Sequence, residues 1–534
     1  MKPLKKSVYG VCALALAVGL AACSSEPTDD GKKKEGEGNG AAGSGEGGDL
    51  VIAMMSAPVN LDPHGVGDVA SSQIQDLIYE RLIQFDENRE LEPVLAKDWK
   101  EEGNKLTFEL QEGIKFHDGE DFNAEVVKKN IERIKDEDLA SQRAFLFEKV
   151  SEINVLGDYE IEFVTEEPFV PLVYSFAHSG GSMISPASID ADYEAIEAGA
   201  KPYTKVSEKP AGTGYFKYDS GVAGSSEIVL KKNEDYRDGP PKLDSVTFKH
   251  VKEASTRLAE VESGNSHIAD SVEVSLLNQL DNMQGAHLSV TDGIAGSYYG
   301  FNAKKKPFDN PDVRRAIAMA IDNKVIVDNI WNGQAILPTG PIPPGVFGYD
   351  ESIQPLPYDP EKAKELLDKA GVKDLSFSIT TNDNPQRKAT AEYMQSELGK
   401  LGINVEVKEQ EWATFLEATA NGEHDMFILG WGAATGDGDY ALEPLFHTDR
   451  QGAPGNRSFY SNTELDEILD QAAREEDEKV RLDLYKKAQE IVIEDAPVVY
   501  TNYTKYLKGI RDEVKNVRVD ADDKYNLYET YIEK

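Results

Sequence analysis

The sequence predicts an α/β protein in which strands and helices alternate. Between residues 375 and 431, three strand-like apolar runs are separated by two stretches whose apolar residues have helical spacing. This βαβαβ alternation predicts a largely parallel sheet covered on both faces. The 534 residues suggest two to four domains, and the lack of a repeat with a period of 20–50 residues excludes solenoids and propellers.

Apolar periodicity and turn residues place the individual elements along the chain. Strands are predicted at Leu50–Met55, Glu160–Val164, Leu375–Thr380, Ile403–Gln410, Met426–Trp431 and Val498–Asn502. Helices are predicted at Ser71–Leu82, Gln386–Leu401, Trp412–Ala420, Glu464–Ala473 and Glu478–Asp495.

Prolines mark the starts of two further helices. Asn310-Pro311 opens a helix predicted to run through Ile330, because proline is tolerated in the first turn, where no N–H is needed. Asp359-Pro360 opens another helix, which is predicted to end near Gly371 because glycine commonly follows the last turn.

The stretch from Lys105 to Val127, KLTFELQEGIKFHDGEDFNAEVV, combines a strand, a tight loop and the start of a helix. Lys105–Leu110 alternates in polarity and is rich in residues that favour strands. Ala124–Ile134 has helical spacing, and Asn123 is placed to cap it. Between them, His117-Asp118 is interpreted as a polar turn in preference to a metal site or an acid–base pair.

This stretch closely resembles the signature of the large solute-binding proteins of ABC importers, a family that captures peptides, nickel complexes and glutathione. The resemblance covers nearly the whole mature chain. It implies a two-lobed periplasmic-binding-protein clamshell of the large, three-domain type II, with mixed sheets. Gly212-Thr213-Gly214 stands where the family's chain returns to its first domain. We therefore interpret this segment as a crossover and not as a phosphate loop, which would need a Gly-Lys-Ser/Thr ending and a following helix.

The N-terminal residues differ in composition from the rest. Residues 1–22 have a basic start and an apolar run too short to span a membrane comfortably, which predicts a secretory signal peptide. Leu20-Ala21-Ala22-Cys23 resembles a bacterial lipobox, which implies lipidation of Cys23 and anchoring on the outer face of the cytoplasmic membrane. Residues 23–48 are rich in Gly, Ser and charged residues and predict a flexible tether. The resemblance divides the remainder into lobe I (49–80, 206–305 and 505–534), a small accessory domain (81–205) and lobe II (306–504).

Charge and motif content exclude several classes of protein. The formal net charge is −39, and it becomes −42 when the three lysines of the signal are lost. Such acidity argues against nucleic acid and anionic lipid as partners. The chain lacks G-x-S-x-G, H-E-x-x-H and nucleotide-loop motifs, and Asp437-Gly438-Asp439 does not complete a calcium loop. We expect no enzyme activity, no metal and no cofactor.

The predicted ligand site lies at the end of strand Met426–Trp431, because ligands of open α/β lobes bind beyond the carboxyl ends of strands. In peptide-binding relatives, the backbone at the positions matching Gly430, Trp431 and Gly432 pairs with an extended ligand. The segment matching Gly67, Asp68 and Val69 flanks the other side. The Trp431 ring could close over a ligand, and the alternative is ordinary packing at a strand end.

Many peptide binders have an aspartate shortly after this Gly-Trp, but here that place is Ala434. The stretch GWGAATGDGDYALEPLF looks instead like the glutathione-binding branch, as do Met183–Ala187, Lys306–Arg315 and Tyr358–Gly371. Two charged residues are therefore predicted to hold the ligand. Arg387, at a helix start, matches an arginine that binds the ligand carboxylate in relatives, and Asp437 is the candidate for the ligand ammonium. Tyr298 and Asn302 are further candidates, with filling or capping as their alternative.

The sequence thus predicts a lipid-anchored extracytoplasmic binding protein that captures glutathione or a short peptide and docks, as a monomer, on the permease of an ABC importer. A di- or oligopeptide-binding protein of the same fold remains open as an alternative. A sensory or chaperone-like surface lipoprotein and a secreted hydrolase are disfavoured alternatives. Nickel or haem cargo occurs in the family, but no cysteine or histidine cluster supports it here.

Overall fold

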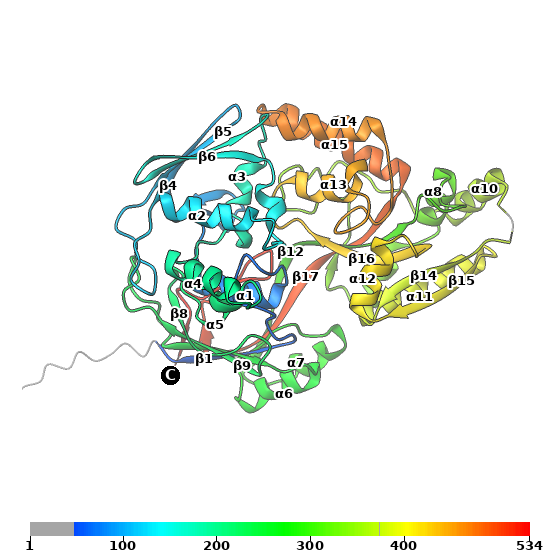
Figure 1. Cartoon of the computed structure of the whole chain (residues 1–534). Coiled ribbons are helices and arrows are strands. Elements are labelled where there is room, and N and C mark those ends of the chain that lie inside the picture. Colours follow the sequence, from blue (N-terminus) through cyan, green and yellow to red (C-terminus); the bar gives the residue numbers. More distant parts are fainter. Residues whose placement is uncertain (1–46, 373, 534) are drawn as a thin grey trace, which may run out of the picture. The chain divides into compact units, whose positions relative to one another are not determined.

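An 11-stranded mixed sheet runs through the part of the chain that the computed structural model describes, residues 47–372 and 374–533 (Figure 1). β1 is parallel to β10 and β11, and β14 is parallel to β15 and β16, whereas the other pairs along the sheet are antiparallel. The predicted parallel pairing is therefore confirmed for β14, β15 and β16, whereas the sheet as a whole is mixed. The strand order is β15 (Asn404–Gln410), β14 (Ser376–Asn382), β16 (Met426–Gly432), β12 (Ala286–Phe301), β17 (Val498–Arg511), β11 (Ile268–Ala269), β1 (Asp49–Met54), β10 (Ser245–His250), β9 (Glu227–Lys232) and β8 (Phe216–Gly221), with β13 (Ala335–Ile336) beside β17.

The long strands β12 and β17 pair with each other through both predicted lobes. Residues 286–292 of β12 pair with residues 505–511 of β17, and residues 296–300 pair with residues 498–503, with register shifts after Asp292 and Ser297. β17 is longer than the predicted Val498–Asn502, because pairing with β12 supplies hydrogen bonds to residues that lack a strong strand pattern of their own. The division of the chain into lobes stays a prediction.

A second sheet of four antiparallel strands forms within residues 81–205, which we call the accessory segment. Its order is β4 (Ala96–Glu102), β5 (Lys105–Leu110), β7 (Glu160–Thr165) and β6 (Val150–Gly157). Helix α2 (Ala124–Lys135) contributes to the same apolar core, in which Phe108, Phe163 and Phe176 are fully buried. The predicted strand Lys105–Leu110 and the Asn123 cap of the following helix are both confirmed, and the Asn123 side chain accepts from the Val126 N–H at 3.1 Å.

The turn at His117-Asp118 joins the accessory segment to the crossover at Gly212–Gly214. The His117 N–H donates to the Gly212 carbonyl at 2.8 Å, and its Nε2 donates to the Gly214 carbonyl, also at 2.8 Å. A Cβ added at Gly212 would lie 2.2 Å from the Ile78 carbonyl oxygen, so this close approach requires glycine. The turn at His117-Asp118 therefore docks on the crossover segment through hydrogen bonds to its backbone carbonyls.

Two helix predictions differ from the structure. Helix α1 is Val69–Ile78 and not Ser71–Leu82, because Asp68 caps its first turn and Tyr79 is extended. The single helix through Ile330 is wrong, since the chain forms α8 (Pro311–Met319), the short α9 (Asn323–Val325) and the π-helical turn η4 (Ile326–Ile330). Asp322 causes the break, because its side chain accepts from the Lys324 N–H at 2.9 Å and so begins a new helix.

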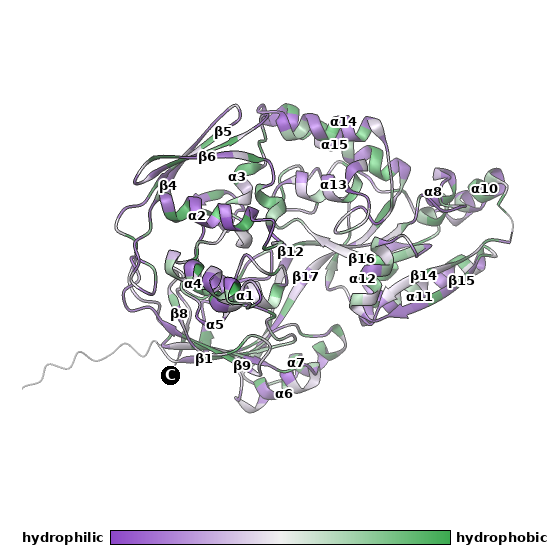
Figure 2. Cartoon of the chain, viewed as in Figure 1, coloured by the Kyte–Doolittle hydropathy of each residue, from purple (hydrophilic) through white to green (hydrophobic). Residues whose placement is uncertain are grey.

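The other helices lie within two residues of their predicted ends, and Gly371 follows α10 in the left-handed region, with φ of +69°. Figure 2 shows hydrophilic and hydrophobic residues mixed along helix α14, as its packing on one face requires. These helices are α10 (Pro360–Ala370), α11 (Pro385–Lys400), α12 (Trp412–Ala420), α14 (Thr463–Arg474) and α15 (Glu478–Asp495). The remaining elements include α3 (Leu172–Ser175), α4 (Pro186–Glu197), α5 (Thr204–Glu208), α6 (Ala254–Ser263), α7 (Leu277–Asp281), α13 (Gly438–Phe446), β2 (Ile83–Phe85) and β3 (Leu91–Pro93). They also include four two-residue strands, β18 (Val514–Lys515), β19 (Arg518–Val519), β20 (Tyr525–Asn526) and β21 (Tyr531–Ile532).

A buried ionic cluster ties the accessory segment to the loop before α1. The Arg133 guanidinium of α2 contacts Asp62 at 2.7 Å and Asp192 at 2.8 Å, and all three side chains are at most 1% exposed. The same guanidinium lies 3.1 Å from His64 Nδ1. Because both carboxylates bond to the one guanidinium, this cluster holds residues 62–64 against α2 and α4.

We predict that Arg133→Ala lowers the free energy of unfolding by about 3–5 kcal/mol, because it leaves two buried carboxylates without a cationic partner. Urea denaturation measures this change. Lys324→Ala, which breaks the exposed pair with Asp328, is the control and should have a much smaller effect. Equal effects of the two substitutions would contradict the prediction.

Burial of His117 predicts a specific pH dependence of stability. Burial lowers the pKa of this imidazole to about 4, whereas the unfolded chain has the ordinary value of about 6.5. The unfolded state therefore binds more protons between these values, so stability is present above about pH 6.5 and is lost as the pH falls toward 4. Thermal melts between pH 7.5 and pH 4.5 should show a smaller loss for His117→Gln than for the unmodified protein. Parallel curves would refute the assignment.

Candidate functional site

The end of β16 has one edge that no strand covers among the described residues. On one side, Gly430, Trp431 and Gly432 pair with Ser297, Gly296 and Ala295 of β12. On the other side, β14 pairs with β16 only at Met426 and Phe427. The backbone beyond Phe427 can therefore accept an extended chain as an added strand.

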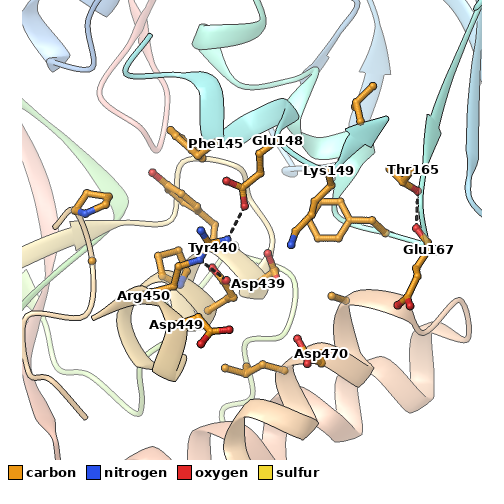
Figure 3. Close-up of a pocket in the computed structure, with 18 of the residues that line it drawn as sticks. Phe145, Glu148, Lys149, Thr165, Glu167, Asp439, Tyr440, Asp449, Arg450 and Asp470 are labelled. Atoms are coloured by element: carbon orange, nitrogen blue, oxygen red, sulfur yellow. Dashed lines mark hydrogen bonds and ion pairs between the residues drawn. The ribbon is translucent and has the colours of Figure 1, made fainter. Parts of the chain in front are cut away.

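A cavity of about 1020 Å³ lies beside Trp431 (Figure 3). Its walls come from three parts of the chain that are far apart in sequence: Gly67 before α1, residues 142–151 and 165–169 of the accessory segment, and residues 439–455 and 469–474 around α13 and α14. Its size is at the upper end of the range of small-molecule sites. Of the predicted site residues, Gly67 and Trp431 line this cavity.

Aromatic rings form one wall and link the two sides of the cavity. Trp431 lies 5.3 Å from Tyr440, and its indole N–H donates to the Tyr440 carbonyl at 2.8 Å. Tyr440 in turn stacks on Phe145 of the accessory segment, with ring centroids 5.3 Å apart and an interplanar angle of 10°. The Trp431 ring is thus fixed in place and presents a rigid apolar surface to the cavity.

Arg143 is a cavity residue that the sequence analysis missed. Its side chain is buried, with only 7% of the residue exposed, and its Nε has no hydrogen-bond partner. No carboxylate among the described residues lies within ion-pair distance of it, and burial lowers its pKa. A Cβ added at Gly67 would lie 3.5 Å from Nη1, so the predicted flanking segment packs on this guanidinium. No pattern around Arg143 in the sequence signals this position.

Asp437, the predicted ammonium partner, does not line the cavity. Its buried carboxylate accepts from the Arg481 guanidinium at 2.7 Å and from the Tyr485 hydroxyl at 2.7 Å, and it also caps α13. Asp439, two residues on, does line the cavity and forms no ion pair with a described residue. Burial, together with the nearby carboxylates of Glu443 and Asp437, raises the pKa of Asp439 well above its usual range.

Arg387 lies at the start of α11, as predicted, but outside the lining of the large cavity. Its Nη1 donates to the Asn382 side chain at 3.1 Å, and its guanidinium stands 5.7 Å from the centre of the Trp412 ring. A Cβ added at Gly430 would lie 3.4 Å from Nη2, so the guanidinium faces the uncovered part of β16. Burial lowers its pKa, and it forms no ion pair with a described residue.

Four further predicted ligand residues lie outside the lining of the large cavity, and their role stays a prediction: Tyr298, Asn302, Asp68 and Val69. Tyr298 is buried against Phe427 and Tyr500, and the Asn302 amide donates to the Gly422 and His424 carbonyls. Asp68 caps α1 by accepting from the Ser71 N–H at 2.9 Å, while its Oδ2 is buried without a partner. Val69 is 49% exposed at the helix start.

Ion pairs connect the accessory segment to the opposite side of the cavity. Arg450 contacts Glu148 and Glu443, both at 2.6 Å, and Figure 3 shows the first of these contacts spanning the cavity. Arg474 contacts Glu167 at 2.5 Å. These side chains are between 23% and 65% exposed, so each pair stabilises the contact only weakly.

A large mixed sheet, a separate antiparallel sheet and a cavity walled by distant parts of the chain define a two-lobed α/β binding protein. Residues 90–453 match the bacterial extracellular solute-binding proteins, family 5, and the chain belongs to this family. No helix among the described residues is long and apolar enough to cross a membrane, and within the same residues no three His, Cys, Asp or Glu side chains are grouped to hold a metal.

Relatives and solved structures agree with this assignment. The glutathione-binding protein GsiB of Escherichia coli K12 is 32% identical over 462 residues, which cover 84% of this chain and 88% of GsiB. The periplasmic binding protein DppA of Helicobacter pylori, solved with the peptide STSA, has 30% identity and a TM-score of 0.81, covering 92% of this chain and 99% of that one. A dipeptide-binding protein of Pseudoalteromonas sp. SM9913, solved with Met-Leu, has 25% identity and a TM-score of 0.79, covering 91% and 100%.

The two aspartates of α13 are predicted to respond differently to substitution. Asp437→Asn leaves the buried Arg481 without its anionic partner and should lower the free energy of unfolding by about 3–5 kcal/mol. Asp439→Asn removes a carboxylate whose charge is disfavoured and should leave stability unchanged or slightly higher. Urea denaturation at pH 7 compares them, and a larger loss for Asp439→Asn would reverse the assignment.

Proposed function

We propose that the protein captures a short peptide or glutathione beside Trp431 and delivers it to the permease of an ABC importer. The observation that carries this proposal is the presence of two guanidinium groups without carboxylate partners at the site. Arg387 faces the uncovered part of β16 at Gly430, and Arg143 faces the cavity. In this proposal both guanidinium groups bind ligand carboxylates, because neither has an anionic partner among the described residues.

The ligand would lie as an added strand along Gly430–Gly432, with the rigid Trp431 surface beside it. Its ammonium group would contact Asp439, which takes the role that the sequence suggested for Asp437, because the Asp437 carboxylate is already bonded to Arg481. The ligands named for GsiB, glutathione, and for DppA, the peptide STSA, each combine an ammonium group with at least one carboxylate group.

We further propose that Cys23 carries the lipid that anchors the protein on the outer face of the cytoplasmic membrane, since Leu20-Ala21-Ala22-Cys23 resembles a lipobox. Cys23, the signal peptide and residues 24–46 of the predicted tether lie outside the described residues. Gly47 and Gly48, the last two residues of that tether, accept hydrogen bonds from Ile532 and Asp244. We also propose that the two lobes close on the ligand as a hinge, with the closed form favoured by ligand.

Calorimetric titration of the purified protein tests the capture of ligand. We predict saturable binding of reduced glutathione, oxidised glutathione or a pool of di- to pentapeptides. Arg387→Ala should weaken that binding at least tenfold, because one charge-assisted hydrogen bond contributes about 1.5 kcal/mol or more.

Lys388→Ala is the matched control, since Lys388 neighbours Arg387 but is exposed and pairs with Glu409. It should leave affinity within about twofold. Absence of binding to every ligand would overturn the proposed function, and equal effects of the two substitutions would remove Arg387 from the site.

A further inference from the structure

The cavity beside Trp431 is lined by more carboxylates than cationic side chains. Seven Asp and Glu residues and four Lys and Arg residues line it. Figure 3 shows Asp439, Asp449 and Asp470 from the α13–α14 side and Glu148 and Glu167 from the accessory segment around the same space. The whole chain carries a net charge of the same sign, −39, so the long-range field adds to the local one.

The two arginines of the α13–α14 side are not free to hold a ligand anion. Arg450 is bonded to Glu148 and to Glu443, and Arg474 lies 2.5 Å from Glu167 and 3.9 Å from Asp470. Each guanidinium thus already faces two carboxylates. The favourable electrostatic interactions left for a ligand anion in this cavity come from Arg143 and from the exposed Lys149.

Asp439 is in the opposite situation, because it lines the cavity without a cationic partner. Its nearest charged neighbours include the carboxylates of Glu443 and Asp437, and the nearby cations Arg450 and Arg481 are each paired with one of them. A ligand ammonium or guanidinium beside Asp439 would relieve this repulsion. A ligand carboxylate in the same place would increase it.

We propose that the cavity selects short peptides that carry a basic side chain over ligands of net negative charge such as glutathione. The ammonium group and the basic side chain lie among Asp439 and the neighbouring lining carboxylates, and the ligand carboxylate lies at Arg143 and Arg387, neither of which has an anionic partner among the described residues. Glutathione has two carboxylates and one ammonium group, so its net charge is negative, and even with its carboxylates on Arg387 and Arg143 it is repelled by the excess of carboxylates in the cavity lining. This inference rests on the proposed function, because it takes this cavity as the ligand site.

The test compares ligands of one length that differ only in charge. Calorimetry of the purified protein is performed with Ala-Lys-Ala-Ala, Ala-Gln-Ala-Ala, Ala-Glu-Ala-Ala and reduced glutathione. The expected affinity falls in the order Lys, Gln, Glu, with at least a tenfold difference between the Lys and Glu peptides and with glutathione below the Gln peptide. Raising the salt concentration from 50 mM to 500 mM should reduce the ratio of the Lys-peptide affinity to the Glu-peptide affinity. Salt screens both the attraction of the Lys side chain and the repulsion of the Glu side chain by the lining carboxylates.

Two variants test whether Asp439 causes the preference for a basic side chain. Asp439→Asn should weaken all four ligands, because each carries an ammonium group, and it should also reduce the Lys to Glu affinity ratio to below threefold, because one carboxylate fewer then faces the second cationic group. Asp281→Asn removes an exposed carboxylate at the end of α7, which is outside the cavity lining, and should leave the ratio unchanged.

The outcomes separate the two levels of the proposal. Binding of glutathione or the Glu peptide as tightly as the Lys peptide overturns the charge selection and leaves peptide or glutathione capture intact. Failure of all four ligands to bind overturns the proposed function and the selection together. A Lys preference that survives in Asp439→Asn overturns the role of this residue.

Discussion

The antiparallel pairing of β12 with β17 is the constraint on which the rest of the fold depends. These two strands share hydrogen bonds from residues 286 to 300, and every other strand of the large sheet joins one side or the other of this pair. β16 is placed by pairing with β12, which leaves its other edge uncovered beyond Phe427. The position of the candidate site therefore follows from backbone pairing, and side chains then give it its chemistry.

Charged groups in this protein fall into two classes with different effects. The pairs Arg133–Asp62 and Arg481–Asp437 are fully buried, so removing one partner would leave an uncompensated charge, and they fix loops rigidly. The pairs Arg450–Glu148 and Arg474–Glu167 are partly exposed and are the contacts that join the accessory segment to the α13–α14 side. In the proposed hinge motion, the exposed pairs are the contacts that would break, while the buried cluster would keep the accessory segment attached to the loop before α1.

Local signals in the sequence were sufficient for most elements and failed where a polar side chain redirected the backbone. The signature stretch gave its strand, turn and helix, because alternating polarity, a cap residue and helical spacing act within a few residues. Apolar spacing continues through α8, α9 and η4 and so predicted a single helix. In the structure, the Asp322 side chain caps α9 and starts a new helix there. The full length of β17 depends on its partner strand and has no local signal.

The sequence by itself determined the family, the place where strand β16 ends and the position of Arg387 at the start of α11. These features depend on motifs and helix caps formed by residues that are close together in the chain. Only the tertiary structure decided which acid lines the cavity beside Trp431. Asp437 and Asp439 are two residues apart at the start of α13, and they differ because Arg481, 44 residues from Asp437, bonds to Asp437 and leaves Asp439 in the cavity lining. Arg143 likewise becomes a cavity residue through packing against Gly67 and Gly180. Burial and partner choice are properties of contacts between distant segments, which no single stretch of sequence contains.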